Sequence, residues 1–297
     1  MKKTLAMMTA AMMVAGALAG CGSSSSTPAA TTAAATEAAT TAAATEAATT
    51  EAAGDTTAAA EGTVKTPSGK FTVGFDQEFP PMGFVGDDGE FTGFDLDLAK
   101  EVASRLGLEF VPQPINWDAK DMELESGNID CIWNGFTMQG REDAYSWVGP
   151  YMANNQVFVV NADSDIASKA DLAGKAVEVQ KDSSGLAALQ DDAELSASFG
   201  SMTEVADYNT ALMDLESGAC DAVCMDSIVA GYQIKSSGKD MKILDDTLSA
   251  EEYGIGFKKG EDELAKAVYD TLMEMKDDGT VAKISNDWFG SDVFTLK

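Results

Sequence analysis

The sequence predicts an α/β fold made of two lobes that share one plan. Strand-like runs alternate with helical patterns along residues 70–133, which is typical of helices layered on a sheet. In addition, the phrase Leu-Glu-Ser-Gly-x-x-Asp at 124–130 recurs 91 residues later at 215–221. Each copy predicts a helix end, a Gly in the left-handed position after it, and an Asp that opens an apolar strand. A chance match is the alternative to two similar lobes.

The elements before the midpoint follow from periodicity and turn signals. Residues 70–75 form a short strand-like run, and the Pro- and Gly-rich stretch 76–93 after it predicts turns. A helix is expected over 94–106, because apolar residues recur at every fourth position, and Gly107 ends it. This part is completed by strands at 108–111 and 129–133 and a helix at 118–126.

The later elements continue the alternation. Apolar runs predict strands at 157–160, 176–179, 199–205 and 253–257. Helices are expected at 209–217, 261–278 and 281–288. In the longest of them, four-residue spacing relates Leu264, Val268 and Leu272.

Residues 1–21 predict a secretory signal that is not part of the fold. Two lysines precede an apolar stretch at 5–18, which is too short for a comfortable membrane span. The segment ends in Leu18-Ala19-Gly20-Cys21, which resembles the lipobox of bacterial lipoproteins, a class in which the Cys is acylated and becomes the new N-terminus. Acylation of Cys21, for example with palmitate, would anchor the protein to a membrane without a transmembrane helix. A plain signal peptide or an uncleaved anchor is the alternative.

Residues 22–66 predict a disordered tether. They consist mainly of Ser, Thr and Ala with scattered Glu, and one nonapeptide occurs at both 31–39 and 40–48. Large apolar side chains are nearly absent, so burial cannot offset the loss of chain entropy. Such a tether would let an anchored domain reach across a cell-wall layer, while a linker without a specific purpose is the alternative.

Composition excludes several classes of chemistry. The 297 residues contain 20 Lys plus Arg, 49 Asp plus Glu and no His, which gives a formal net charge of −29. The lack of His removes the Ser-His-Asp triad and His-ligated zinc or haem. The negative charge argues against nucleic acid and against electrostatic docking on anionic lipid. We therefore expect no metal, no cofactor and no nucleic-acid partner.

Three cysteines follow Cys21, a number that does not make a disulfide framework. Two of them, Cys220 and Cys224, lie in one apolar run. We expect both to be buried as small apolar side chains. A disulfide or a metal pair is the alternative.

Six motifs occur in a characteristic order along residues 67–297. They are Phe75-Asp76-Gln77-Glu78-Phe79-Pro80-Pro81; Gly93-Phe94-Asp95-Leu96-Asp97-Leu98-Ala99; Gly135-Phe136-Thr137 leading to Arg141 and Gly149-Pro150-Tyr151; Leu172-Ala173-Gly174-Lys175 with 177–184; Asp221-Ala222-Val223 with Asp226; and Asp278-Gly279-Thr280 with Trp288-Phe289-Gly290. Each motif alone is weakly specific. Together they resemble the polar amino-acid-binding proteins of ABC importers, family 3 of the bacterial extracellular solute-binding proteins.

The resemblance implies a periplasmic-binding-protein-like fold of type II, in which two α/β lobes are joined by a hinge with two chain crossings. The crossings are expected near 154–158 and 251–256. Lobe 1 would then contain 67–155 and 252–297, and lobe 2 would contain 156–251. The ligand would lie in the cleft between the lobes, which close on it.

Three residues are expected to hold the ligand's carboxylate. The Arg141 guanidinium would pair with it bidentately, and the resemblance adds the backbone N–H groups of Thr137 and Ser184. A solvated Arg paired with Glu142 or Asp143 is the alternative. In the family, the Arg commonly lies five positions after this Thr. In this chain Arg141 lies four positions after Thr137, so the loop must be one residue tighter.

The ligand's ammonium group is expected to bind Asp226, with the carbonyl group of Gly135 as a helper. Asp226 ends an apolar strand, where an Asp needs a partner or water. The alternative for Asp226 is capping of the helical segment after Ser227.

The remaining predicted contacts surround the ligand's carbon body and side chain. Phe79 and Trp117 match the family's two stacking positions, with core packing as the alternative. Asp76 matches the position that meets the ligand's side chain; Glu78 is close by and is equally well explained as a surface residue. Asn134 and Trp133 adjoin the end of the predicted cleft strand, and Ser183 offers a second hydroxyl donor, with helix capping as its alternative.

These expectations together describe a binding protein rather than an enzyme. It would be a lipid-anchored monomer on the outer face of the cell membrane that captures a polar amino acid and delivers it to ABC permease subunits. Some relatives of this scaffold are dehydratases of prephenate-like acids, such as cyclohexadienyl dehydratase, and this chemistry needs no His. A dehydratase and a sensory module are therefore the two alternatives.

Overall fold

The computed structural model describes Thr66 and residues 68–297. The predicted signal with Cys21, and nearly all of the predicted tether at 22–66, lie outside these residues. Within the described part, no helix is both long and apolar enough to cross a membrane.

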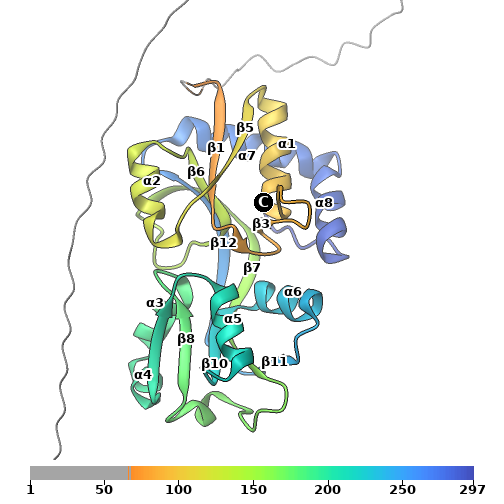
Figure 1. Cartoon of the computed structure of the whole chain (residues 1–297). Coiled ribbons are helices and arrows are strands. Elements are labelled where there is room, and N and C mark those ends of the chain that lie inside the picture. The colour runs from red at the N-terminus through yellow and green to blue at the C-terminus, as the bar shows by residue number, and fades with distance from the viewer. Residues whose placement is uncertain (1–65, 67) are drawn as a thin grey trace, which may run out of the picture. The chain divides into compact units, whose positions relative to one another are not determined.

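A nine-stranded mixed sheet organises the fold (Figure 1). Its spatial order is β5 (Glu109–Pro114), β1 (Lys70–Phe75), β6 (Cys131–Thr137), β12 (Ser249–Lys258), β7 (Tyr145–Asn161), β10 (Ala222–Asp226), β8 (Ala176–Gln180) and β9 (Ser201–Val205), and β11 (Met241–Ile243) pairs with β7. A second, small sheet contains β2 (Glu78–Phe79), β3 (Gly83–Val85) and β4 (Phe91–Thr92).

Helices follow the strands in alternation, as the sequence predicted. The α-helices are α1 (Phe94–Leu106), α2 (Lys120–Ser126), α3 (Ser184–Asp191), α4 (Ala193–Ser198), α5 (Tyr208–Ser217), α6 (Ser227–Ser237), α7 (Asp262–Asp277) and α8 (Thr280–Phe289). Two short 3₁₀ turns are η1 (Trp117–Ala119) and η2 (Lys169–Leu172).

Two long strands, β7 and β12, divide the sheet into two groups of elements. They pair antiparallel from Ser249 opposite Gln156 to Lys258 opposite Tyr145. One end of this ladder adjoins β6, and the other adjoins β10. We call β1–β6 with α1, α2, α7 and α8 the first half, and β8–β11 with α3–α6 the second half (Figure 1).

The repeated phrase has the same structure in both halves. Gly127 after α2 and Gly218 after α5 are both left-handed, with φ of 76° and 77°. The side chain of Asp130 then accepts from the backbone N–H of Thr72 at 2.6 Å, and that of Asp221 accepts from Ala176 at 2.8 Å. Each Asp therefore fixes its strand against the parallel neighbour, β1 in one half and β8 in the other.

Several predicted element bounds were wrong. The strand predicted at 157–160 is the end of the 17-residue β7, whose Gly149-Pro150 and polar residues 154–156 interrupt the apolar pattern. The strand predicted at 199–205 begins only at Ser201, and α4 precedes it. The stretch 76–93, expected to consist of turns, contains the small sheet.

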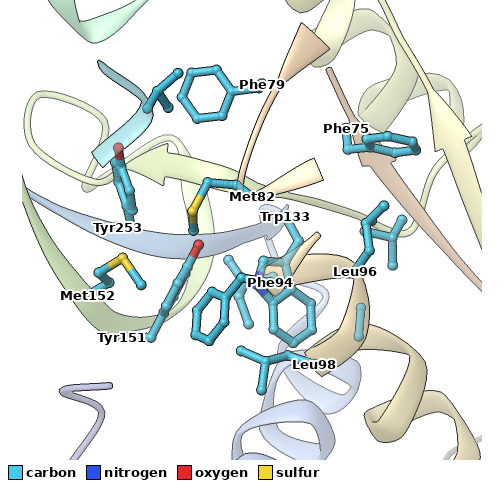
Figure 2. Packing of buried hydrophobic residues seen from close by; sticks show 14 of the residues in the cluster. Phe75, Phe79, Met82, Phe94, Leu96, Leu98, Trp133, Tyr151, Met152 and Tyr253 are labelled. Carbon is cyan, nitrogen blue, oxygen red and sulfur yellow. The ribbon is translucent and has the colours of Figure 1, made fainter. Parts of the chain in front are cut away.

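The main cluster of buried apolar residues extends over both halves and includes residues of α1 and α7 and of α5 and α6. Figure 2 shows Phe94, Leu98, Trp133 and Tyr151 packed together, and all four side chains are fully buried. Cys220 and Cys224 are buried free thiols, as expected for small apolar side chains.

Shortening Leu272 to Ala should destabilise the protein by about 2–5 kcal/mol, because a fully buried Leu leaves a cavity. Thermal or urea unfolding would measure the loss. Met213, which is 57% exposed on α5, gives the matched control: Met213→Ala should change stability by less than about 0.5 kcal/mol. Equal stability of the two variants would contradict the packing described here.

Candidate functional site

Nine of the ten residues predicted for the ligand site line one small cavity of about 10 Å³. The nine are Phe79, Trp117, Asn134, Gly135, Thr137, Arg141, Ser183, Ser184 and Asp226, and Gln180 completes the lining. Both halves contribute to the lining. Gln180, Ser183, Ser184 and Asp226 belong to the second half, and the other lining residues belong to the first half. The carboxyl ends of strands from both halves meet here: β6, which is parallel to β1, ends at Thr137, and β8 and β10, which are parallel to each other, end at Gln180 and Asp226.

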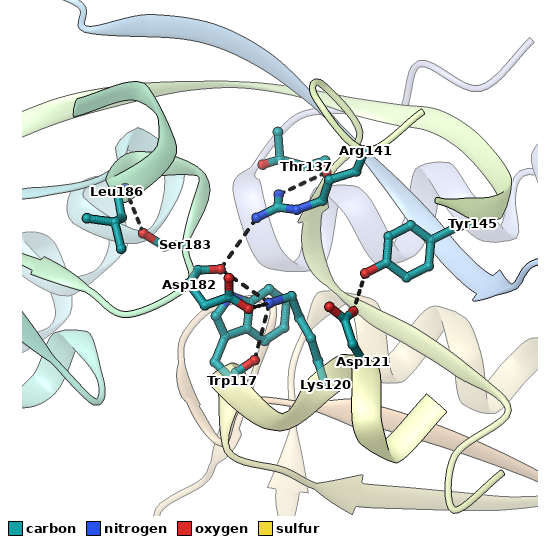
Figure 3. A network of polar contacts seen from close by, with 9 residues as sticks. All are labelled: Trp117, Lys120, Asp121, Thr137, Arg141, Tyr145, Asp182, Ser183 and Leu186. Carbon is teal, nitrogen blue, oxygen red and sulfur yellow. Dashed lines mark hydrogen bonds and ion pairs between the residues drawn. The ribbon is translucent and has the colours of Figure 1, made fainter. Parts of the chain in front are cut away.

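Arg141 lies beside the loop that enters α3 (Figure 3). Its Nη1 donates to the carbonyl oxygen of Thr137 at 3.2 Å, and its Nη2 donates to that of Asp182 at 3.4 Å. Arg141 forms no ion pair with Glu142 or Asp143, all three of which the structure describes, so the alternative of a solvated surface pair does not hold. The guanidinium is therefore held by carbonyl oxygens and has no carboxylate partner among the described residues.

The N-terminus of α3 faces the same cavity. Ser183 is the N-cap residue, and its Oγ accepts from the N–H of Leu186 at 3.0 Å, so the capping alternative for Ser183 is correct. Ser184, the first residue of α3, accepts from the Thr137 hydroxyl at 3.1 Å, which links the two halves. The free N–H groups of a helix start favour an anion at this place.

Asp226 also lines the cavity and is only 3% exposed. Its Oδ1 accepts from the Tyr253 hydroxyl and from Asn154 Nδ2, each at 2.7 Å. It occupies the N-cap position of α6 without a side-chain capping bond, so the capping alternative is wrong. Burial and the nearby charge of Glu251 raise the pKa of Asp226 to about 8.

The backbone conformation and the close neighbours of residue 135 require a glycine at this position. Its φ is +57°, and a Cβ at this position would lie 2.9 Å from the Phe79 ring. Its N–H donates to Asp95 at 2.7 Å, and burial raises the pKa of that fully buried carboxyl to about 7. Asp95, which belongs to one of the sequence motifs but was not among the predicted site residues, thus fixes the backbone at the cavity wall.

The aromatic residues both line the cavity and pack against other rings. The Phe79 ring lies 5.8 Å from that of Tyr208, and the Trp117 ring meets Phe136 edge-on at 5.6 Å. Trp133 is fully buried in the main core and does not line the cavity. Of the three predicted residues Trp133, Asn134 and Ser183, only Asn134 and Ser183 line the cavity.

Asp76 does not line this cavity. It lines a neighbouring, more open one, together with Glu78 and Trp117. Its Oδ2 accepts from Gln180 Nε2 at 2.7 Å, so it contacts the second half through a residue of the main cavity. Burial raises the pKa of Asp76 to about 6.

Lys120 makes a contact between the halves that the sequence did not predict (Figure 3). Its Nζ pairs with the Asp182 carboxylate and donates to the carbonyl oxygens of Asp182 at 3.2 Å and Trp117 at 3.4 Å. The side chain is buried, and this burial lowers the pKa of Lys120. Asp182 has a left-handed φ of 53°, and its carbonyl oxygen accepts from both Lys120 and Arg141.

Besides Asp95 and Lys120, four residues of the cavity region were missed by sequence reasoning: Asn154, Gln180, Asp182 and Glu251. Gln180 had a usable signal, since it ends a strand parallel to the one that ends at Asp226. Asn154 and Glu251 fall at the predicted crossings and Asp182 falls in the 177–184 motif, but the roles of these three residues depend on how the halves meet.

Comparison with known proteins identifies the family of this chain. Residues 71–291 match the family model described as bacterial extracellular solute-binding proteins, family 3. The L-cystine-binding protein TcyJ of Escherichia coli is 31% identical over 76% of this chain and 84% of its own length. The L-cystine-binding protein TcyA of Bacillus subtilis is 32% identical over 76% and 83%.

Among solved structures, an ABC uptake transporter substrate-binding protein from Streptococcus pneumoniae with bound histidine has a TM-score of 0.74. It is 34% identical and covers 77% of this chain and 95% of its own. These neighbours confirm the predicted periplasmic-binding-protein-like α/β fold. They are binding proteins and not enzymes, as predicted for this chain, so the dehydratase alternative is not favoured. The chain belongs to family 3 of the bacterial extracellular solute-binding proteins.

Proposed function

We propose that this protein captures a polar amino acid as a zwitterion in the cavity between its halves and delivers it to an ABC permease. One observation carries this proposal: Arg141 and Asp226, which are oppositely charged when ionised, line the same cavity. Relatives whose names give L-cystine and histidine as ligands support an amino acid as the ligand class.

The cavity offers each end of an amino acid a matching partner. Arg141 and the N-terminus of α3 would bind the carboxylate, and Asp226 with the Gly135 carbonyl group would bind the ammonium. Phe79 and Trp117 would contact the carbon body. Hydrogen bonds to charged groups contribute about 1.5–3 kcal/mol each. Several of them reach the ~−8 kcal/mol that corresponds to micromolar affinity.

Closure of the halves about β7 and β12 would enclose the ligand. The proposed lobes are 67–155 with 252–297, and 156–251, and the crossings near 154–158 and 251–256 fall in these two strands. Contacts between the halves, such as Thr137 with Ser184 and Asp76 with Gln180, would stabilise the closed arrangement.

The proposed location is the outer face of the cell membrane. Acylation of Cys21 would anchor the chain, and residues 22–66 would serve as the tether. We expect a monomer that meets the permease only transiently. Mass spectrometry of the mature N-terminus would test the anchor, because an acylated Cys21 has a distinctive mass.

Replacing Lys120 with Met should accelerate amino-acid release and weaken affinity about tenfold, or ~1.4 kcal/mol. The reason is that Lys120 joins the halves through Asp182 at the edge of the cavity. Stopped-flow measurement of dissociation would check this. Lys258→Met, which removes the exposed pair of Lys258 with Glu125, is the control and should release at the wild-type rate. Equal rates for Lys120→Met and the control would contradict the role of Lys120.

A thermal-shift panel of the twenty amino acids and cystine tests the proposed function. A true ligand raises the melting temperature with concentration, because it binds only the folded state. At least one polar amino acid should do so. If no compound in the panel shifts the melt, the proposed function is wrong.

A further inference from the structure

Two buried carboxyl groups lie next to each other at one side of the cavity. Asn154 Nδ2 donates to Asp226 Oδ1 and to Glu251 Oε1, each at 2.7 Å. Because one amide nitrogen reaches both, the two side chains are neighbours. Glu251 is 5% exposed and Asp226 is 3% exposed. Neither takes part in any ion pair of residues 68–297.

The groups of the described chain that face this pair carry no positive charge. Glu251 Oε1 also accepts from Gln156 Nε2 at 3.0 Å and from the Ser184 hydroxyl at 3.4 Å. On the Asp226 side, the partners are the hydroxyl groups of Tyr253 at 2.7 Å and Tyr208 at 3.3 Å, with the Cys224 thiol nearby. Burial raises the pKa of Tyr208, Tyr253 and Cys224. These neutral donors do not neutralise two buried carboxylates, which repel each other.

Glu251 is also connected to the predicted carboxylate end of the site. Ser184, whose hydroxyl donates to Glu251, lines the cavity and accepts from Thr137. Glu251 itself does not line the cavity. It therefore acts on a ligand through Asp226 and Ser184, as a positioning residue.

We propose that Glu251 is a second counter-charge of the site, and that the Asp226–Glu251 pair holds one positive charge, a proton in the ligand-free protein and the ligand's ammonium group in the complex. This inference rests on the proposed function. When the ammonium group binds, the proton leaves the pair for solvent. Consistent with this exchange, the pKa of Asp226 is raised to about 8 by burial and by the charge of Glu251.

The exchange also selects the ligand. An amino acid carries a positive nitrogen that can replace the proton. An N-acetyl amino acid presents a neutral amide instead, and the pair would keep its proton. The site should therefore reject N-acetylated ligands even where the space admits the acetyl group.

Isothermal titration calorimetry tests the exchange, with L-cystine and L-arginine as probes at pH 7. Because Tris and phosphate have different ionisation enthalpies, comparing the two buffers counts the protons released. Wild-type protein should release about one proton per bound amino acid. Glu251→Gln should release clearly fewer, whereas Glu252→Gln, at the exposed neighbouring position, should behave as wild type. Binding with the same enthalpy in both buffers would overturn the inference and leave the proposed function standing.

A second measurement needs no ligand. A carboxyl group whose pKa is higher in the folded than in the unfolded state makes stability fall as pH rises between those two pKa values. Urea unfolding from pH 5 to pH 9 should therefore show a shallower decline for Glu251→Gln than for wild type and Glu252→Gln. Asp226→Asn serves as a second variant if Glu251→Gln does not fold. If stability falls with pH equally in wild type and in all variants, the two carboxyl groups do not share a proton. This result can be obtained even if neither L-cystine nor L-arginine binds.

Discussion

Replacing Arg141 with Ala should remove most of the affinity for amino acids and leave the ligand-free fold intact. Truncating one partner of a buried charge pair costs about 2–5 kcal/mol, so we expect Kd to rise roughly 30- to 4,000-fold. The fold should tolerate the change, because the Arg141 guanidinium makes two long bonds to carbonyl oxygens, at 3.2 and 3.4 Å, and lies over the Phe136 ring at 5.2 Å without any ion pair. Calorimetry would measure the affinity, and thermal unfolding would measure the stability.

Two further variants sharpen this experiment. Arg141→Lys keeps the charge but loses the fork that pairs with a carboxylate, so its affinity should fall between those of Arg141→Ala and wild type. Arg105→Ala is the control, since Arg105 pairs with Glu101 and Asp278 and does not line the cavity. Unchanged affinity in Arg141→Ala would remove Arg141 from the site.

Replacing Asp226 with Asn should weaken binding by about 10²-fold or more, because the ammonium group loses its charged partner. The same variant should be more stable than wild type at alkaline pH. The two effects have opposite signs, which separates a role in binding from a role in folding. A general loss of structure would lower both affinity and stability.

The pH range of the stability effect follows from the raised pKa. The pKa of Asp226 is about 8 in the folded protein, against an ordinary value of 3.8. Between these values the folded state binds more protons than the unfolded state, so stability falls as pH rises, by roughly 1.4 kcal/mol per pH unit. The amide that replaces the carboxyl group in Asp226→Asn does not titrate. The two proteins should therefore be similar near pH 4 and diverge up to pH 8, with Asp226→Asn the more stable; parallel curves from pH 4 to pH 9 would contradict the raised pKa.

Periodicity located the longest helices, but it gave no range for α3, α4 or α6. The four-residue spacing of Leu264, Val268 and Leu272 located α7, whose buried face these residues form. By contrast, β7 was recognised only over its apolar end at 157–160. Its middle contains Asn154, Asn155 and Gln156. The side chains of Asn154 and Gln156 donate to Glu251 beside the cavity, and no local pattern distinguishes such a strand from a loop.

The candidate site was found through ordered motifs rather than through local chemistry. Phe79, Arg141 and Asp226 are far apart in the sequence, and no spacing rule brings them together. What the motifs did not provide were contacts that exist only when the halves meet. Lys120 and Asp182 are 62 residues apart, and Glu251 lies 97 residues from the Asn154 that bridges it to Asp226. Asp76 was assigned to the ligand, whereas its carboxylate is occupied by Gln180 and the Glu78 N–H.

The most direct test of the whole account is a crystal structure of the protein with the amino acid that gives the largest thermal shift. We predict one molecule in the cavity, with its carboxylate on Arg141 and the start of α3, and its ammonium group on Asp226. A molecule bound with its two ends reversed, or bound outside the space between the halves, would contradict the account.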